Sequence, residues 1–484
     1  MSSNIKVRLT GFILFVSNLA SFLFGFIFTV LVSRNLSQHD LGIWFYIGSV
    51  VTYFEFLVKV IPYWAVRDFA RGRRVAKTAI IFSGLLSIPL MLCFITLSRS
   101  LSTYIETSIT VFLVASLLIP LYYVSASVNA ILYARYPHKV GWRVPIIDGL
   151  KIPLGVALLS FGLAGVLTAV VIANFLYLTY GLYVIRSEFE ERIDHNWLKN
   201  RFRHSWLPIM QSGIGYINSA SDSFLVGTLI SPIQLSIYGI GTTISNAVRT
   251  SSQLVLPFSM KVLAKTVTTR EEITSILKFL SIFTVPMLVG GILLSREIYR
   301  IFGSVYVEGA GVLWILILSA TLLSYSSLFS GIVSGTEKID YNLDVSFKSL
   351  VKSKLFVTML IDYNITTMLI VSSLTLIPIL GVVGAALSRL ISSLTALIIF
   401  TRICSNYIDV KKNLINFVKI AIACLPMSIY LILFTYPKAI FTILSIFIGA
   451  TIYFTTLCLI DKESRDLVKK FIKEFTGKVF SILD

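Results

Sequence analysis

Apolar runs of about 20 residues recur from end to end of this chain, and no other feature limits its fold so strongly. Each run is long enough to cross a bilayer as an α-helix. Backbone groups in lipid must satisfy their own hydrogen bonds, and continuous runs of this length do so as helices rather than barrel strands. Fourteen runs are found, near 10–32, 41–62, 76–97, 108–133, 144–161, 163–185, 206–230, 236–260, 273–294, 311–334, 354–378, 381–401, 417–436 and 439–460. The sequence predicts an all-α polytopic membrane protein of about 14 transmembrane helices.

The formal net charge of +18 has a one-sided distribution along the predicted connections. If the N-terminus is cytoplasmic and the connections alternate, most of the 42 lysines and arginines fall on cytoplasmic segments. The exterior connections then carry only Arg34, Arg99, Arg296, Arg300 and Lys438. This bias follows the positive-inside rule and predicts a multi-pass protein of the cytoplasmic membrane with both termini in the cytoplasm. The basic surplus is expected to face membrane lipids with anionic headgroups, not nucleic acid.

The cysteines and histidines give no sign of a metal or cofactor site. The four cysteines lie in or beside predicted spans without a C-x-x-C spacing, and the four histidines are scattered through connections. Neither pattern matches a metal site or a disulfide framework, so we expect no metal and no cofactor. The connections are also too short to fold alone, which excludes a large extramembrane domain.

Two pairs of similar segments indicate an internal repeat. "VSRNLSQHDLGIWFYIG" (32–48) aligns with "VGTLISPIQLSIYGIGT" (226–242), and each is the exterior turn between two predicted spans. Gly162-x2-Gly165 matches Gly381-x2-Gly384, each opening the last span of a six-span set. An even number of spans separates the copies, so the halves are parallel repeats, an arrangement that places a transporter's substrate site between them. The predicted parts are an N-lobe (1–200), a C-lobe (201–405), two further helices (406–460) and a basic cytoplasmic tail (461–484).

Three motifs carry a family resemblance. Arg34-x-Leu36-Ser37-x3-Leu41-Gly42-x-Trp44 is similar to the segment after the first helix of polysaccharide-exporting flippases. Asp222-x2-Leu225-Val226-Gly227 resembles the opening of their second half, and Gly381-x2-Gly384-Ala385-Ala386 the start of their twelfth helix. Over about its first 400 residues the chain resembles this polysaccharide biosynthesis and export (O-antigen-flippase-like) family of the multidrug/oligosaccharidyl-lipid/polysaccharide exporter superfamily. The resemblance implies two six-helix lobes in a V-shaped arrangement around a hydrated, mostly cationic cavity. Related lipid-carrier flippases often carry basic residues on the first helix, whereas the span 10–32 has none.

Polar stripes mark the spans that could line such a cavity. Positions three and four apart share one face of a helix, and the span 236–260 has a polar face that includes Asn246, Arg249 and Gln253. The span 206–230 carries Asn218 and Asp222 at a spacing of four. Small and polar residues also pack transmembrane helices together, so both a cavity wall and a packing interface fit these stripes.

Charged residues inside predicted spans are candidate functional groups, because ionisable side chains are unfavourable there. Arg249 lies about 20 Å from the exterior end of its span, at a rise of about 1.5 Å per residue. Arg389 is a second candidate for substrate binding. Asp222 and Asp362 are candidate ion-coupling or gating acids, or counter-ions to the two arginines.

Three further charges lie nearer the cytoplasmic ends of their spans. Lys151 and Lys278 are expected to extend towards the headgroups, and Asp148 and Lys151 to pair at a spacing of three.

The stretch "FEFLVK" (54–59) places Glu55 and Lys59 four residues apart within an apolar run. Two interpretations remain open. The residues could form a self-neutralising pair with Lys59 at the headgroups. Alternatively they could form an inward-facing gate, in which Lys59 meets an arriving phosphate and Glu55 resists it until displaced.

The combined features favour a flippase for an oligosaccharide linked to a polyprenyl phosphate or pyrophosphate, serving cell-surface polysaccharide or glycan assembly. A guanidinium such as that of Arg249 offers a rigid fork of donors for phosphate oxygens. The protein would be a non-enzymatic monomer, with glycosyltransferases or a polymerase of the same pathway as partners. A cation-coupled multidrug antiporter of the same superfamily and a polytopic glycosyltransferase or ligase remain the alternatives.

Overall fold

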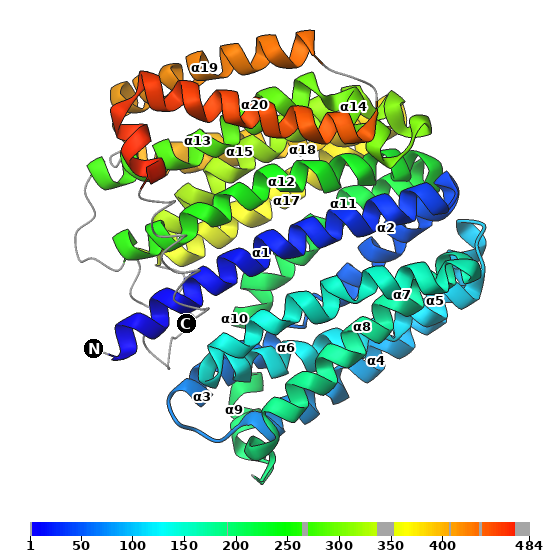
Figure 1. The fold of residues 1–484 in the computed structure, drawn as a ribbon. Coiled ribbons are helices and arrows are strands. Elements are labelled where there is room, and N and C mark those ends of the chain that lie inside the picture. Colours follow the sequence, from blue (N-terminus) through cyan, green and yellow to red (C-terminus); the bar gives the residue numbers. More distant parts are fainter. Residues whose placement is uncertain are drawn as a thin grey trace. The chain divides into compact units, whose positions relative to one another are not determined.

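A computed structural model describes residues 2–190, 192–263, 270–335, 353–405, 408–434 and 438–469. Within these residues every regular element is a helix (Figure 1). The chain divides into two compact units. The N-terminal unit comprises Val16–Gly239 and Leu369–Ala385, and the C-terminal unit comprises Met1–Phe15, Ile240–Met368 and Ala386–Asp484.

The N-terminal unit is built from short and long helices connected by tight turns. α4 packs against α6, α6 against α3 and α8, and α11 against α2. The elements are α1 (Ser2–Asn35), α2 (Gln38–Phe54), α3 (Val60–Ala70), α4 (Ala76–Tyr104), α5 (Ile109–Ser116), α6 (Leu118–Arg135), η1 (Pro137–Trp142), η2 (Val144–Gly149), α7 (Lys151–Leu158), η3 (Leu159–Phe161), α8 (Gly162–Val184), η4 (Arg186–Phe189), α9 (His195–Arg203), α10 (Trp206–Pro208), η5 (Ile209–Gly213) and α11 (Ile214–Leu229).

The C-terminal unit contains most of the remaining helices. α13 packs against α15 and α19, and α19 packs against α20. The elements are α12 (Pro232–Leu263), α13 (Arg270–Leu293), α14 (Ser295–Phe302), η6 (Ser304–Gly309), α15 (Ala310–Gly335), α17 (Lys354–Leu380), α18 (Val382–Ile403), α19 (Val410–Leu433) and α20 (Ala439–Ile460). The division between the units passes through α1, α12, α17 and α18.

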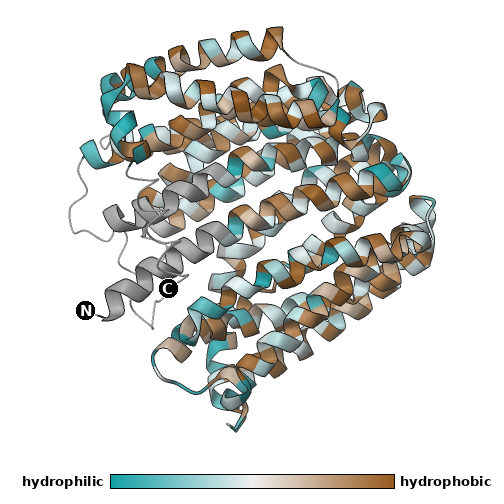
Figure 2. Cartoon of the chain, viewed as in Figure 1, coloured by the Kyte–Doolittle hydropathy of each residue, from teal (hydrophilic) through white to brown (hydrophobic). Residues whose placement is uncertain are grey.

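The helices have the length and composition of membrane spans. Ten stretches of the described chain are long and apolar enough to cross a membrane, and one of them, Pro137–Val184, contains two of the runs read from the sequence. Apolar residues follow the lengths of the helices, and hydrophilic residues gather near many helix ends (Figure 2). Large apolar side chains such as Leu433 and Leu459 are 68% and 82% exposed, as lipid contact requires. The all-helical membrane class is therefore confirmed, while the count of fourteen spans stays a prediction.

The apolar run 41–62 does not form one helix. α2 ends at Phe54, residues 55–59 form a turn, and α3 begins at Val60. In this turn the Val58 amide donates to the Glu55 carbonyl at 2.8 Å, a spacing of three residues in place of the helical four. The Tyr123 hydroxyl donates to the Phe54 carbonyl at 2.7 Å. This bond gives a backbone carbonyl at the break a partner, which such a group requires where water is absent. The expectation of an uninterrupted helix is corrected here.

The repeated segments have matching local geometry. The Ser37 hydroxyl accepts a hydrogen bond from the Asp40 amide at 3.0 Å at the start of α2. The Ser231 hydroxyl likewise accepts from the Gln234 amide at 3.3 Å at the start of α12. Such side chains satisfy amides that a helix N-terminus leaves unpaired.

The two glycine pairs also match. Gly162 and Gly381 have φ values of +62° and +60°, a region that favours glycine. A Cβ on Gly165 would lie 2.0 Å from the Leu158 carbonyl oxygen, and one on Gly384 would lie 2.2 Å from that of Leu376. The lobe boundaries after residues 200 and 405 remain a prediction.

Gly42 occupies a close contact between the starts of α2 and α12. A Cβ at this position would lie 1.7 Å from the Pro232 carbonyl oxygen, a backbone atom with little freedom to move. Gly42→Ala is therefore expected to destabilise the protein by about 1–3 kcal/mol through overpacking. Thermal unfolding of the purified protein in detergent measures this change.

Gly25→Ala on α1 is the matched control, because nothing lies within 4 Å of its added Cβ. We expect this variant to be neutral, or more stable by up to about 1 kcal/mol from helix propensity. Equal unfolding temperatures for both variants would show that the Gly42 contact relaxes at no cost.

Lys278 in the C-terminal unit corrects a second expectation. Its side chain is 1% exposed, and its ammonium forms ion pairs of 2.6 Å with both Asp461 and Glu463. Lys419 on α19 also binds Asp461, at 2.9 Å. Burial acts to raise the pKa of the Asp461 carboxyl, but hydrogen bonds from Lys278, Ser464 and Lys419 outweigh it and hold that pKa well below its usual range. Lys278 therefore does not extend to headgroups, because acids that follow α20 neutralise it.

Candidate functional site

A cavity of about 1060 Å³ lies within the N-terminal unit. Its walls come from α2, the turn at 55–59, α3, α6, η2, α7, α8, η5 and α11, with Phe28 of α1. Five charged residues line it, namely Glu55, Lys59, Arg143, Asp148 and Lys151. The cavity thus carries three cations and two carboxylates within a lining that is otherwise polar, aromatic and aliphatic.

Two of the five charges neutralise each other. The Lys151 ammonium lies 2.6 Å from the Asp148 carboxylate, which confirms the pairing expected from their spacing. The Ser21 hydroxyl donates to the same carboxylate at 2.6 Å, and the ammonium lies 5.5 Å from the centre of the Phe28 ring. These contacts fix the pair on one wall, and its net charge is zero.

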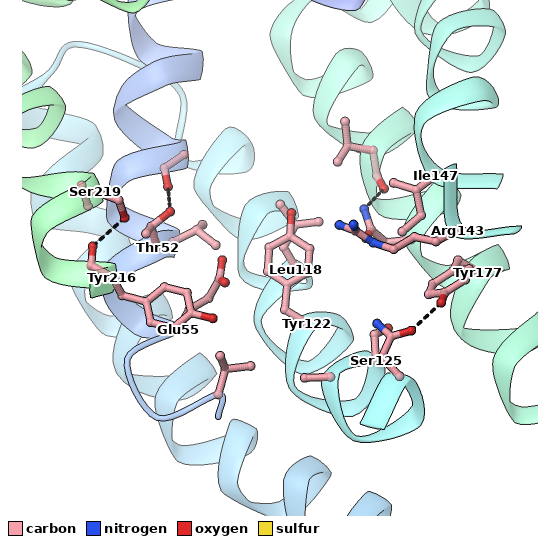
Figure 3. A pocket seen from close by; sticks show the side chains of 18 of the residues that line it. Thr52, Glu55, Leu118, Tyr122, Ser125, Arg143, Ile147, Tyr177, Tyr216 and Ser219 are labelled. Atoms are coloured by element: carbon pink, nitrogen blue, oxygen red, sulfur yellow. Dashed lines mark hydrogen bonds between the residues drawn. The ribbon is translucent and has the colours of Figure 1, made fainter. Parts of the chain in front are cut away.

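The other three charges stay open to the cavity. Arg143 joins η1 to η2, while Glu55 and Lys59 bound the turn between α2 and α3. Among the residues that the structure describes, no hydrogen bond or ion pair within 4.0 Å reaches any of these three charged groups. Glu55 and Arg143 approach from opposite sides, with Tyr122 of α6 between them (Figure 3). The spacing of Glu55 and Lys59 therefore does not produce an ion pair at contact distance.

A polar stripe on α6 forms the wall between these charges. Tyr122, Ser125, Asn129 and Tyr133 all line the cavity, and steps of three and four place them on one helix face. The Tyr177 hydroxyl of α8 donates to the Asn129 side-chain oxygen, which leaves the Asn129 NH₂ group as a donor. The Ser125 hydroxyl is buried and has no hydrogen-bond partner among the residues that the structure describes. This wall offers donors to a ligand, and a buried polar group without a partner is itself unfavourable.

Two predicted site residues on α11 lie beside the cavity but do not line it. Asn218 is half-buried, and Asp222 is 1% exposed. Asp222 accepts hydrogen bonds from the Tyr238 hydroxyl at 2.5 Å and from the Ser223 amide at 2.8 Å. These bonds tie α11 to the first turns of α12 and give Asp222 partners that the sequence did not reveal.

The remaining predicted residues belong to the C-terminal unit. Asn246 and Arg249 are exposed on α12, and Asp362 is exposed on α17. Arg389 is half-buried on α18, and its carbonyl accepts a hydrogen bond from Ser319 at 3.1 Å. The Gln253 side chain lies outside the described residues. The structure thus gathers Glu55 and Lys59 at one cavity, while the roles of the other predicted residues stay proposals.

Sequence reasoning missed the residues that complete this cavity. Arg143 belongs to a segment that the charge distribution assigned to the cytoplasm, where a basic residue needs no further explanation. The stripe of Tyr122, Ser125 and Asn129 was detectable, because it repeats every three or four residues in the predicted span 108–133. Its side chains are uncharged, whereas charged residues within predicted spans, such as Arg249, were the ones selected as candidates.

The apolar helices define a multi-pass membrane protein, and its N-terminal unit encloses a polar cavity. The sequence profile described as "Polysaccharide biosynthesis protein" matches residues 31–310, more than half of the chain. The chain therefore belongs to this polysaccharide biosynthesis family. No curated protein sequence matches it.

Solved structures share its fold. The inward closed conformation of the lipid II flippase MurJ is similar with a TM-score of 0.74, at 16% identity, over 94% of this chain and 100% of that chain. An inward-facing multidrug resistance MATE transporter of the MOP superfamily gives a TM-score of 0.57, at 12% identity, over 81% of this chain and 98% of that chain. The outward-facing conformation of such a transporter gives 0.55, at 13% identity, over 83% and 95%. At these identities the similarity establishes the fold.

Proposed function

We propose that this protein is a flippase that moves a lipid-linked oligosaccharide across the cytoplasmic membrane for surface polysaccharide or glycan assembly. The observation that carries the proposal is the open guanidinium of Arg143 beside the polar stripe of α6 in a cavity of about 1060 Å³. Membership of a polysaccharide biosynthesis family supports a sugar-containing substrate. The similarity to a lipid II flippase supports a substrate attached to a lipid carrier.

The cavity chemistry suits the head group of such a lipid. Arg143 can bind phosphate oxygens with two parallel N–H donors, and Lys59 adds a second cation. Asn129, Asn174 and the neighbouring hydroxyl groups can bind sugar hydroxyls. Transport also requires release of the head group. Two open cations among many neutral polar groups bind it less tightly than a dense basic cluster would.

The predicted residues outside the cavity keep a place in the proposal. Arg249 and Arg389, with Asn246, Gln253 and Asn218, would contact the head group at another stage of transport. Glu55, Asp222 and Asp362 would couple transport to a cation or gate it. The protein would act as a monomer with cytoplasmic termini, supplied by glycosyltransferases or followed by a polymerase.

The test is translocation by the purified full-length protein in liposomes. A fluorescent oligosaccharide on a polyprenyl pyrophosphate carrier is placed in both leaflets, and a membrane-impermeant quencher reports exchange. Wild-type protein is expected to make the inner pool accessible, while Arg249→Ala is expected to slow this exchange without changing protein insertion. Repeating the assay with proton or sodium gradients, and with Glu55, Asp222 or Asp362 neutralised singly, identifies the coupling acid. No exchange above that of protein-free liposomes would refute the proposal.

The cation-coupled antiporter is the second candidate, because Glu55 is an open carboxylate in the cavity and MATE transporters share the fold. An antiporter would move an organic cation such as ethidium against a proton or sodium gradient in the same liposomes. Ethidium transport without exchange of the lipid-linked sugar would favour it. A glycosyltransferase or ligase would instead lengthen or transfer the sugar, which chromatography of the recovered lipid detects.

A further inference from the structure

The cavity of the N-terminal unit has two walls of opposite hydrogen-bonding character. One wall is made by α2, the following turn and α11, and it contains Glu55. The facing wall is made by α6 and the segment around Arg143 (Figure 3). The Asp148–Lys151 pair neutralises itself, so the open charges are Glu55 and Lys59 on the first wall and Arg143 on the facing wall.

Three groups on the Glu55 wall offer acceptors, whereas Lys59 and the Tyr216 hydroxyl on the same wall can donate. The Thr52 hydroxyl donates its hydrogen to the Gly48 carbonyl at 2.8 Å, and the Ser219 hydroxyl donates to that of Tyr216 at 2.9 Å. Because each hydroxyl has only one hydrogen, its oxygen can present only lone pairs to the cavity. An ionised Glu55 carboxylate also presents only lone pairs. Glu55, Thr52 and Ser219 all line the same cavity.

The Arg143 wall offers donors. The guanidinium has only N–H groups. The Asn129 side-chain oxygen accepts from Tyr177, and its NH₂ group makes no hydrogen bond within the described part of the chain. A phosphate or pyrophosphate, which has only acceptor oxygens, matches this wall. The same phosphate would be repelled by Glu55 and would leave the acceptors of the other wall without a donor.

We propose that the head group carried by this cavity combines a phosphate with a sugar that has a free, positively charged amino group. An ammonium has three N–H donors and no acceptor, so it matches Glu55, Thr52 and Ser219 as the phosphate matches Arg143 and Asn129. Lys59 does not occupy this position, because its ammonium lies beyond 4.0 Å from the Glu55 carboxylate in the described chain. The inference rests on the proposed transport of a lipid-linked sugar and specifies its class, a lipid-linked amino sugar.

Three synthetic ligands with one polyprenyl pyrophosphate carrier test this inference. They carry glucosamine, N-acetylglucosamine or glucose, so that only the substituent on one sugar carbon changes. Binding to the full-length protein in lipid nanodiscs is measured by titration. Wild-type protein is expected to bind the glucosamine ligand about tenfold or more tightly than the other two, the size of one charge-assisted hydrogen bond.

Variants assign the preference to the acceptor wall. Glu55→Gln keeps the shape of the side chain but removes its charge, and it is expected to lower glucosamine-ligand affinity about tenfold. Its affinity for the glucose ligand should not fall, because that ligand has no ammonium for the carboxylate to bind and its phosphate is no longer repelled. Thr52→Val removes one acceptor with little change in shape and is expected to weaken only the glucosamine ligand, by a smaller factor. Glu106→Gln is the matched control, since Glu106 is exposed and does not line the cavity.

The outcomes separate this inference from the proposed function. Equal affinity of wild-type protein for all three ligands, or a glucosamine preference that survives both Glu55→Gln and Thr52→Val, would overturn the inference while leaving lipid-linked sugar binding in place. Failure of wild-type protein to bind any of the three ligands would contradict the proposed function as well. Loss of the preference in Glu55→Gln, with Glu106→Gln unchanged, would support the inference.

Discussion

Replacement of Arg143 by alanine is expected to weaken binding of a polyprenyl pyrophosphate ligand about a hundredfold, which corresponds to about 3 kcal/mol. The reason is the loss of two charge-assisted hydrogen bonds to phosphate. Arg143 has no hydrogen bond or ion pair with the described residues, so its removal should leave the unfolding temperature unchanged. Titration of nanodisc-embedded protein with the lipid measures the affinity, and thermal unfolding in the same samples checks the fold.

Two further variants separate the charge of Arg143 from its shape. Arg143→Lys keeps the positive charge but loses the planar fork, and we expect an intermediate loss of about tenfold. Arg135→Ala is the matched control, because Arg135 is 57% exposed at the end of α6, pairs with Glu188 at 3.2 Å and does not line the cavity. Its affinity should stay within about twofold of wild type. Wild-type affinity in Arg143→Ala would remove Arg143 from the substrate site.

The class of this protein follows from patterns that act locally along the chain. A long run of apolar residues forms a helix in lipid independently of the other segments of the chain, so the all-helical membrane class was predictable. The Asp148–Lys151 pair was predictable for the same reason, since a spacing of three residues brings two side chains together on one helix. The family resemblance rested on motifs around Ser37 and Gly381, whose geometry is also set within a few residues.

Features that depend on contacts between distant segments were not predictable. The run "FEFLV" contains no proline or glycine to mark a break, yet α2 ends at Phe54 where the Tyr123 hydroxyl meets its carbonyl. Lys278 likewise lies at the end of an apolar span, and nothing near it in sequence announces its pairing with Asp461. In both cases the partner lies far away in the sequence and comes into contact only when the helices pack.

The candidate site shows the same distinction. Glu55 and Lys59 were singled out because charges in apolar runs are conspicuous, and both line the cavity. Arg143 was not, because a basic residue on a connection fits the positive-inside rule without any further role. Its importance depends on η1 and η2 turning it towards α6, and one-dimensional charge patterns contain no information about that direction.

Replacement of Asp68 by alanine is expected to destabilise the protein by about 3–5 kcal/mol, because it leaves the largely buried Arg201 guanidinium without its carboxylate. Asp68 on α3 is fully buried. Its carboxylate accepts two hydrogen bonds of 2.9 Å from the Arg201 guanidinium and one of 2.8 Å from the Trp197 indole N–H. Both donors lie on α9, so one carboxylate fastens this helix to α3. The lowered unfolding temperature in detergent measures the loss.

The same substitution is expected to disturb the cavity, since α3 also carries Tyr63 and Val66 of its lining. The double variant Asp68→Ala/Arg201→Ala removes the unpaired charge as well and should be more stable than Asp68→Ala alone. Asp68→Asn keeps one acceptor and should lie between wild type and Asp68→Ala. If Asp68→Ala and the double variant unfold at the same temperature, the penalty does not come from the unpaired guanidinium. The penalty would then come from the lost acceptor of the Trp197 indole N–H, which both variants share, and the hydrogen bond between the Asp194 amide and Thr78 would still connect this segment to α4.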